Sequence, residues 1–368
     1  MNSRFRQISL ELIICAAIPL AAIAGFDEGV AAYEKKDFAT ALSEWKPLAQ
    51  KSDVHAQSNL GNLYAEGQGV SRDYEEAVKW YRLAADQGHA SAQSNLGMMY
   101  ADGLGVPRDY AEAVKWYRLA AEQGHPNGQS NLGAMYADGR GVQRDYEEAI
   151  KWYRLAAEQG FASGQLNLGV MYADGRGVPQ DYKEAIRFFR LAAAQGDALA
   201  QSNLGVIYAD GLDVPQDYKA AGKWYRLAAD QGHAMAQTNL GVMYATGQGV
   251  PQDYKEAVKW YRLAADQDEA TAQCHLGVMY NNGHGVAISR VVAFALFNLS
   301  AANNPSADNK ALGYRTGLAA SMTNKEIEAA QDLTRELYKP KNLAVALDKY
   351  VKKPAVNQRP AKSDSSRR

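Results

Sequence analysis

The chain has 368 residues, with 40 Lys and Arg against 41 Asp and Glu and a formal net charge of −1. This balance gives no overall electrostatic reason to expect binding to nucleic acid or to an anionic membrane surface. Length alone would suggest about two globular domains, but a fixed internal repeat overrides that expectation.

Residues 1–24 are expected to form a secretory signal. Arg4 and Arg6 precede a mostly apolar stretch at 8–24, which is shorter than the roughly 20 residues that a spanning helix needs. The small residues that end at Ala24 fit a cleavage site. The sequence thus predicts a periplasmic or secreted protein that starts near Gly25; the alternative is an uncleaved N-terminal anchor.

Cysteine use predicts a fold without disulfides. The chain has two cysteines, and Cys15 would leave with the signal. Cys274 would then have no partner within the chain.

Residues 25–55 are expected to form a helical hairpin that caps the N-terminal end of the array. Its apolar, small and capping residues predict two helices joined by a short turn. The residues that carry it are Ala32, Tyr33, Asp37, Phe38, Ala41 and Trp45.

From residue 56 to 303 the same 36-residue unit recurs seven times without insertion or deletion. Each copy has a leucine followed by a glycine, and the leucines are Leu60, Leu96, Leu132, Leu168, Leu204, Leu240 and Leu276. A constant period of this length is typical of a solenoid, in which each unit buries its apolar face against its neighbours.

The second copy shows how one unit is expected to fold. Apolar residues at helical spacing lead to Gly103, which can end a helix in the left-handed conformation. Asp109 then stands where an N-cap belongs, and Glu112 three residues later predicts a variant capping box. Gly97 is expected to allow close approach of the two helices.

The unit reads A-x-x-x-L-G-x-x-Y-x-x-G-x-G-V-x-x-D-Y-x-x-A-x-x-W-Y-x-x-A-A-x-x-G, which resembles the Sel1-like repeat, a relative of the tetratricopeptide repeat. Residues 26–50 resemble an ordinary tetratricopeptide hairpin. The resemblance is to the bacterial secreted or periplasmic type. It implies an all-α fold, an α-solenoid of stacked antiparallel helix pairs in a right-handed superhelix.

The C-terminal end departs from the repeat. In the last unit, Ser289 and Arg290 replace the Asp-Tyr pair. Residues 304–338 are expected to form capping helices, one over 308–320 and one opened by a capping box at Thr323. Residues 339–368 are expected to be a basic, disordered tail with a short helix at 343–350.

An asparagine precedes the repeat leucine in six copies, at Asn59, Asn95, Asn131, Asn167, Asn203 and Asn239. The resemblance places this position on a concave groove. A carboxamide there can bond to both the N–H and the C=O of an extended peptide. The alternative is structural: each asparagine would bond to a carbonyl of the next repeat and fix the stacking.

Small and acidic residues are expected beside this row. The small polar set is Ser58, Ser94, Ser130 and Ser202, and the acidic set at helix ends is Asp102, Asp138, Asp174 and Asp210. An acid at a helix C-terminus opposes the macrodipole. It would therefore bond to loop N–H groups or form a stripe that favours cationic partners.

Nothing in the pattern indicates catalysis, a metal site or a cofactor. The histidines form no H-x-x-x-H or H-E-x-x-H pair, and the Trp-Tyr pairs recur at core spacing. Some secreted Sel1-like proteins of the cysteine-rich type have been linked to β-lactamase activity, but this chain lacks their paired cysteines.

These observations favour a non-enzymatic scaffold that binds an extended peptide or a partner protein in its groove. A binder of peptidoglycan or other envelope glycans, aided by the basic tail, is the alternative. A β-lactamase-like hydrolase ranks last. Neither nucleic acid nor integral membrane insertion is expected.

Overall fold

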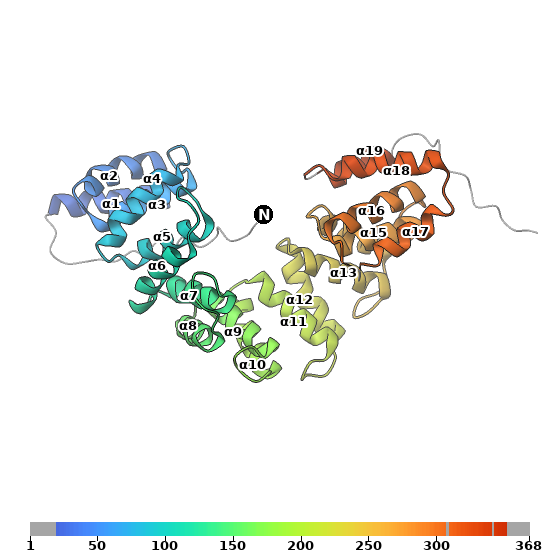
Figure 1. The fold of residues 1–368 in the computed structure, drawn as a ribbon, viewed down its shortest axis with the longest axis horizontal. Coiled ribbons are helices and arrows are strands. Elements are labelled where there is room, and N and C mark those ends of the chain that lie inside the picture. Colours follow the sequence, from blue (N-terminus) through green and yellow to red (C-terminus); the bar gives the residue numbers. More distant parts are fainter. Residues whose placement is uncertain (1–19, 307–308, 341, 352–368) are drawn as a thin grey trace, which may run out of the picture. The chain divides into compact units, whose positions relative to one another are not determined.

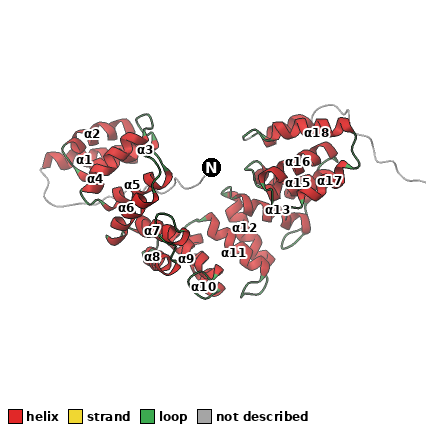
Figure 2. Ribbon diagram, viewed as in Figure 1, coloured by secondary structure: helices red, strands yellow, loops and turns green. Residues whose placement is uncertain are grey.

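The computed structural model describes residues 20–306, 309–340 and 342–351. These ranges contain nineteen α-helices and no strand (Figures 1 and 2). The predicted all-α class is therefore confirmed. Within the same ranges, no helix has the length and apolar character needed to cross a membrane.

The chain divides into two compact units at residues 192 and 193. The N-terminal unit holds an N-terminal hairpin and most of repeats 1–4. Its helices are α1 (Leu20–Glu34), α2 (Phe38–Gln50), α3 (Val54–Glu66), α4 (Tyr74–Asp86), α5 (Ala90–Asp102), α6 (Tyr110–Glu122), α7 (Pro126–Asp138), α8 (Tyr146–Glu158) and α9 (Ala162–Asp174). Helix α10 (Tyr182–Ala194) runs across the division.

The C-terminal unit holds repeats 5–7 and the closing helices. Its repeat helices are α11 (Ala198–Asp210), α12 (Tyr218–Asp230), α13 (Ala234–Thr246), α14 (Tyr254–Ala265), α15 (Ala270–Asn282) and α16 (Arg290–Asn303). The closing helices are α17 (Ala311–Ala319), α18 (Asn324–Leu337) and α19 (Leu343–Val351). In each repeat the odd-numbered helix comes first. Within each unit, these first helices pack against the second helix of their own repeat, as in α5 and α6, and against the second helix of the repeat before, as in α6 and α7 or α12 and α13.

The helix ends follow the predicted signals, with one correction. Gly103 closes α5 at a φ of +71°, in the left-handed region. Asp109 caps α6 by accepting hydrogen bonds from the backbone N–H groups of Ala111 and Glu112. The expected return bond of a capping box is not made, because the Glu112 carboxylate instead pairs with Lys115 at 3.4 Å.

A glycine on the first helix lets an aromatic ring of the second helix lie flat against its backbone. A Cβ atom on Gly97 would stand 2.7 Å from Cδ1 of Tyr117, closer than atoms can pack. The Tyr117 side chain is 3% exposed. The same contact joins Gly61–Tyr81, Gly133–Tyr153, Gly169–Phe189, Gly205–Tyr225, Gly241–Tyr261 and Gly277–Phe297. The Trp-Tyr tyrosines therefore belong to the core, as the spacing predicted.

The closing helix α18 takes the place that the first helix of an eighth repeat would have. It packs against α16, and the predicted capping box of Thr323 and Glu326 is present at its start. Asn298 of α16 donates to the Thr334 hydroxyl of α18 at 3.4 Å. The corresponding positions of earlier repeats hold an arginine and a tyrosine.

The chain ends differ in how far the structure describes them. Residues 1–19 of the expected signal and residues 352–368 of the expected tail lie outside the described ranges. Helix α1 begins at Leu20, before the expected cleavage point. Helix α19 lies inside the segment expected to be a disordered tail, where the sequence suggested a short helix. It packs on α18 and α14.

Candidate functional site

The first helices of successive repeats lie side by side within each unit. Helix α7 packs next to both α5 and α9, and α11 packs next to α13. Because the period is constant, a residue type that recurs on these helices forms a row. Three such rows matter here: one of glutamines, one of asparagines and one of serines.

The glutamine row locks neighbouring repeats together. Gln93 is 4% exposed, and its Nε2 donates to the carbonyl of Ala85, at the end of the preceding repeat's second helix, at 3.1 Å. Its Oε1 accepts from Nε2 of Gln123, which follows the second helix of its own repeat, at 2.7 Å. One buried carboxamide therefore adds a hydrogen bond to a helix-end carbonyl and joins the C-terminal ends of two helices.

This lock recurs along the array. The donations from glutamine to carbonyl join Gln57–Ala49, Gln129–Ala121, Gln165–Ala157, Gln201–Ala193, Gln237–Ala229 and Gln273–Ala265. The acceptances join Gln87–Gln57, Gln159–Gln129, Gln231–Gln201, Gln267–Gln237 and Asn303–Gln273. Sequence reasoning missed these residues, although this glutamine recurs in all seven copies.

The asparagine row lies two positions further along the same helices. Asn95 is 7% exposed, and the other five side chains are half-buried. Asn95 donates to Oδ1 of Asn62 at 3.2 Å, and the same oxygen accepts from the Tyr81 hydroxyl at 2.8 Å. Burial raises the pKa of Tyr225, and the nearby Asn239 partly offsets that rise.

The remaining asparagines are different. Within the described residues, no hydrogen bond is made by the side chains of Asn59, Asn131, Asn167 and Asn203. The bond to a neighbouring repeat's carbonyl, which the structural alternative assigned to asparagine, is made by glutamine instead. Four half-buried carboxamides thus keep donors and acceptors available.

The serine row lies inside the packing. Ser58, Ser94, Ser130 and Ser202 are only 2–4% exposed. Thr238, which takes this position in repeat 6, bonds to the Ala234 carbonyl and to Glu269. These side chains have almost no surface of their own with which to contact a ligand.

The acidic residues at the first-helix ends are exposed, but they are not alike. Asp138 pairs with Arg140 at 3.2 Å, and Asp174 pairs with Arg176 at 3.0 Å. These arginines, and not loop N–H groups, compensate the two acids. Within the described ranges, Asp102 and Asp210 form no ion pair.

Histidines at the repeat boundaries act as helix caps. Nδ1 of His89 accepts from the Ala92 N–H at 3.2 Å, so this nitrogen must be unprotonated. Burial, together with the nearby His55 and His125, lowers the pKa of His89 to about 4. His125 caps α7 in the same way, through Gly128.

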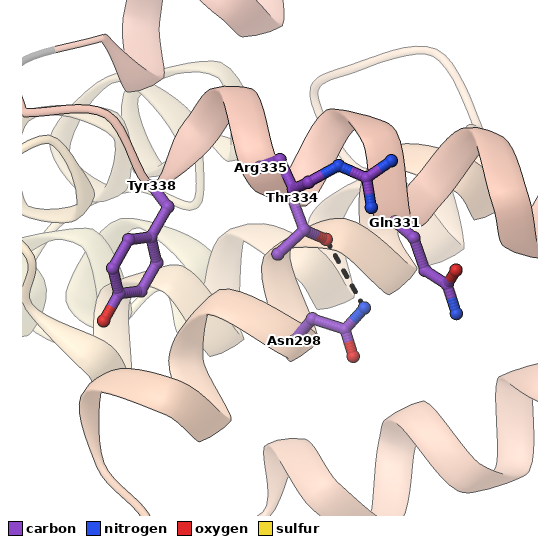
Figure 3. A pocket seen from close by; sticks show the side chains of 5 residues that line it. All are labelled: Asn298, Gln331, Thr334, Arg335 and Tyr338. Carbon is purple, nitrogen blue, oxygen red and sulfur yellow. Dashed lines mark hydrogen bonds between the residues drawn. The ribbon is translucent and has the colours of Figure 1, made fainter.

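An open cleft of roughly 360 Å³ lies between α16 and α18 (Figure 3). Its lining residues are Asn298, Gln331, Thr334, Arg335 and Tyr338. The cleft forms because Asn298 and Thr334 are smaller than the arginine and tyrosine that fill this place in other repeats.

Cys274 is a buried free thiol, and burial raises its pKa to about 11. The described residues contain no cluster of three or more His, Cys, Asp or Glu that could hold a metal ion.

Comparisons with known proteins place the repeats in a family. The sequence model described as "Sel1 repeat" matches seven consecutive segments, which together span residues 54–305. A search of curated proteins gave no match.

Two solved structures are similar to the chain. One is a Sel1 repeat protein from Oxalobacter formigenes, with 35% identity and a TM-score of 0.61, over 65% of this chain and 96% of that one. The other is a protective antigen of uropathogenic Escherichia coli, described as having an SLR fold. It has 30% identity and a TM-score of 0.51, over 93% of this chain and 89% of the other.

Proposed function

Because the chain belongs to the Sel1 repeat family, we propose that it is a non-enzymatic scaffold that binds a protein partner. The binding element is the part of the asparagine row that lies in the N-terminal unit, and the partner contributes an extended segment. The supporting observation is that Asn131 and Asn167, on the adjacent helices α7 and α9, have half-buried carboxamides without a hydrogen-bonding partner in the described chain.

The glutamine lock explains why these asparagines are available. Glutamines already hold the repeat stacking, so the asparagines beside them are not needed for it. A row of carboxamides at a constant period can bond to alternate N–H and C=O groups of an extended chain. Such a row therefore recognises the backbone of the ligand more than the ligand's side chains.

Charge at the edge of the row favours a cationic segment. Asp102 is exposed at the end of α5 without an ion pair in the described residues, whereas Asp138 and Asp174 are already paired. A Lys or Arg of the ligand near Asp102 would gain an attraction that salt weakens. Binding is therefore expected to weaken modestly at high ionic strength.

A crosslinking pull-down from envelope extract tests the proposal. The bait is the protein from Gly25 onward, beside the double variant N131A/N167A. A matched control, N281A/N282A, removes two exposed asparagines that bond to each other at the end of α15, a helix that carries no asparagine of the row. All three must first show equal helicity and melting. A partner captured by the parent and the control, but not by N131A/N167A, supports the proposal. Equal capture by all three contradicts it.

We also propose that the protein is secreted or periplasmic. The support is the basic start, the apolar stretch and the small residues that end at Ala24. N-terminal sequencing of the protein from the cell envelope should find Gly25 or a near neighbour first. A chain that still begins at Met1 would contradict cleavage.

A further inference from the structure

The chain carries a helix that is docked onto its own repeats. Helix α19 buries Leu343, Ala346 and Leu347, which share one face at helical spacing. This face joins a core cluster that contains Tyr280 of α15. Tyr280 is 3% exposed, whereas the tyrosines at its position in repeats 2, 3 and 4 are half-buried. The docked helix thus covers a surface that earlier repeats leave open.

Three polar contacts with Arg262 and Asp266, at the C-terminal end of α14, hold α19 in position. The Asp266 carboxylate accepts from the backbone N–H of Ala344 at 3.3 Å, in the first turn of α19. First-turn N–H groups lack a partner inside their own helix, and a carboxylate there also favours the helix dipole. The Arg262 guanidinium pairs with the Asp348 carboxylate and donates to the Ala344 carbonyl at 3.2 Å.

The residues that hold α19 have counterparts in the N-terminal unit. An arginine and, four residues later, an acid stand at the same places on the second helices of repeats 1, 2 and 3. We call these three places the helix seats: Arg82 with Asp86, Arg118 with Glu122, and Arg154 with Glu158. All six side chains are exposed. The tyrosine that corresponds to Tyr280 completes each seat.

The arginines of the helix seats have uncharged hydrogen-bond partners or none within the described residues. Arg118 donates to the Tyr136 hydroxyl at 2.6 Å, and Arg82 donates to the Tyr100 hydroxyl. Arg154 makes no hydrogen bond or ion pair within the described residues. A carboxylate is a stronger acceptor for a guanidinium than a neutral hydroxyl, so an acidic ligand can displace the tyrosine. Arg262 is the arginine at the same position in repeat 6, and there the guanidinium pairs with a carboxylate, that of Asp348.

We propose that the helix seats bind a short amphipathic helix of a partner protein in the manner of α19. The first turn of that helix rests on the acid of a seat, and a carboxylate five residues after its first residue pairs with the arginine. Its apolar face covers the tyrosine. This surface uses none of the row asparagines, so the inference goes beyond the proposed peptide binding.

Each helix seat is expected to bind more weakly than the site of α19. In the C-terminal unit, Leu337 of α18 extends the apolar surface, and it belongs to the same cluster as α19. The first helices of the repeats end at this point in glycines such as Gly139, which offer no side chain. Helix α19 also has the advantage of being tethered to its site. A partner that carries several such helices would regain affinity through multivalency.

A photocrosslinking experiment on the full chain tests the proposal. The probe is a capped peptide of residues 342–351 that carries photo-leucine in place of Leu347, the side chain that faces the seat. Mass spectrometry then locates the crosslinks. We expect labels near Tyr100, Tyr136 and Tyr172. A peptide with Asp348→Asn should label these positions about ten-fold less, because the charged bond is lost.

Variants of one seat provide internal controls. Arg118→Gln should reduce the label near Tyr136 about ten-fold and leave the label near Tyr172 unchanged. N131A/N167A should leave all labels in place, which separates this inference from the asparagine row. Labels confined to α14, α15 and α18 would mean that the peptide only exchanges with α19, and they would overturn the proposal. Equal labelling by the Asp348→Asn peptide would also overturn it.

Discussion

Nε2 of Gln123 donates to Oε1 of Gln93 at 2.7 Å, although the two residues are thirty positions apart. Nε2 of Gln93 in turn donates to the Ala85 carbonyl of the preceding repeat. The two bonds of Gln93 therefore connect the two helices of its own hairpin to the preceding repeat. Because this arrangement repeats along the chain, buried glutamines contribute a hydrogen-bonded contact between neighbouring repeats at many points of the array.

Replacing one buried glutamine of the glutamine lock should strongly destabilise the contact between two neighbouring repeats. In Gln129→Ala, the Ala121 carbonyl and the Gln159 amide both lose a partner, and a cavity forms. We expect a loss of about 2–3 kcal/mol in the free energy of unfolding. Urea denaturation followed by circular dichroism measures it. Gln159→Ala removes a largely exposed partner and should cost about 1 kcal/mol or less. Equal losses would contradict the lock.

Two Gly→Ala changes should have opposite signs. In Gly97→Ala, the new Cβ would stand 2.7 Å from the Tyr117 ring, so the hairpin must open. Overpacking of this kind typically costs about 1–3 kcal/mol. In Gly317→Ala, nothing lies within 4 Å of the new Cβ in α17. Alanine is the better helix former, so a gain of about 0.5–1 kcal/mol is expected. Thermal melting of both variants checks the pair.

Stability should fall as the pH is lowered through the range in which unfolded histidine titrates. The fold holds His89 neutral with a pKa of about 4, below the ordinary value of 6.5. Between these values the unfolded chain binds more protons than the folded one. The free energy of unfolding therefore falls as the pH drops from about 6.5 to 4, by up to about 3 kcal/mol from this group. Above pH 6.5 the contribution is fully present.

The control for this pH effect is His89→Asp. Aspartate caps the first helix at the same position in repeats 1 and 5, through Asp53 and Asp197. The cap is thus retained without the histidine. The difference in unfolding free energy between the parent and the variant should change over pH 4–6.5 and stay constant above about pH 7.5. A difference independent of pH would show that His89 is not held neutral by the fold.

Two Tyr→Phe changes separate a bonded hydroxyl from one without a bond. The Tyr81 hydroxyl donates to Asn62, so Tyr81→Phe should cost about 1 kcal/mol. Within the described residues, the Tyr153 hydroxyl makes no hydrogen bond, and phenylalanine takes its position at Phe189 in the next repeat. Tyr153→Phe is expected to be close to neutral. Urea midpoints of the two variants, compared at equal slope, decide between these outcomes.

The sequence predicted the hairpin because its signals are local. Gly103 and Asp109 end and begin their helices through bonds to residues only a few positions away. The period of 36 then repeated this result seven times. The close approach at Gly97 also followed, because two helix axes come together most easily where one of them carries no side chain.

The glutamine lock was not predicted because its partners lie far apart in sequence. In the sequence alone, Gln93 looks like any other polar residue on a helix, because only the fold brings its partners Ala85 and Gln123 next to it. The row of asparagines is the more conspicuous pattern, because its chemistry fits a peptide. The site of α19 was missed for a similar reason: Arg262 and Asp348 are separated by 86 positions, and nothing local connects them.

The glutamine lock has a consequence for how such a chain can change length. Both of its halves lie inside one 36-residue segment and its neighbour, so a duplicated or deleted segment of that length rebuilds the same lock without any other mutation. Only the N-terminal hairpin and the helices after residue 303 lack this freedom. A gene of this kind can gain or lose repeats in single steps, with the number of repeats under selection while the chemistry of the lock stays fixed.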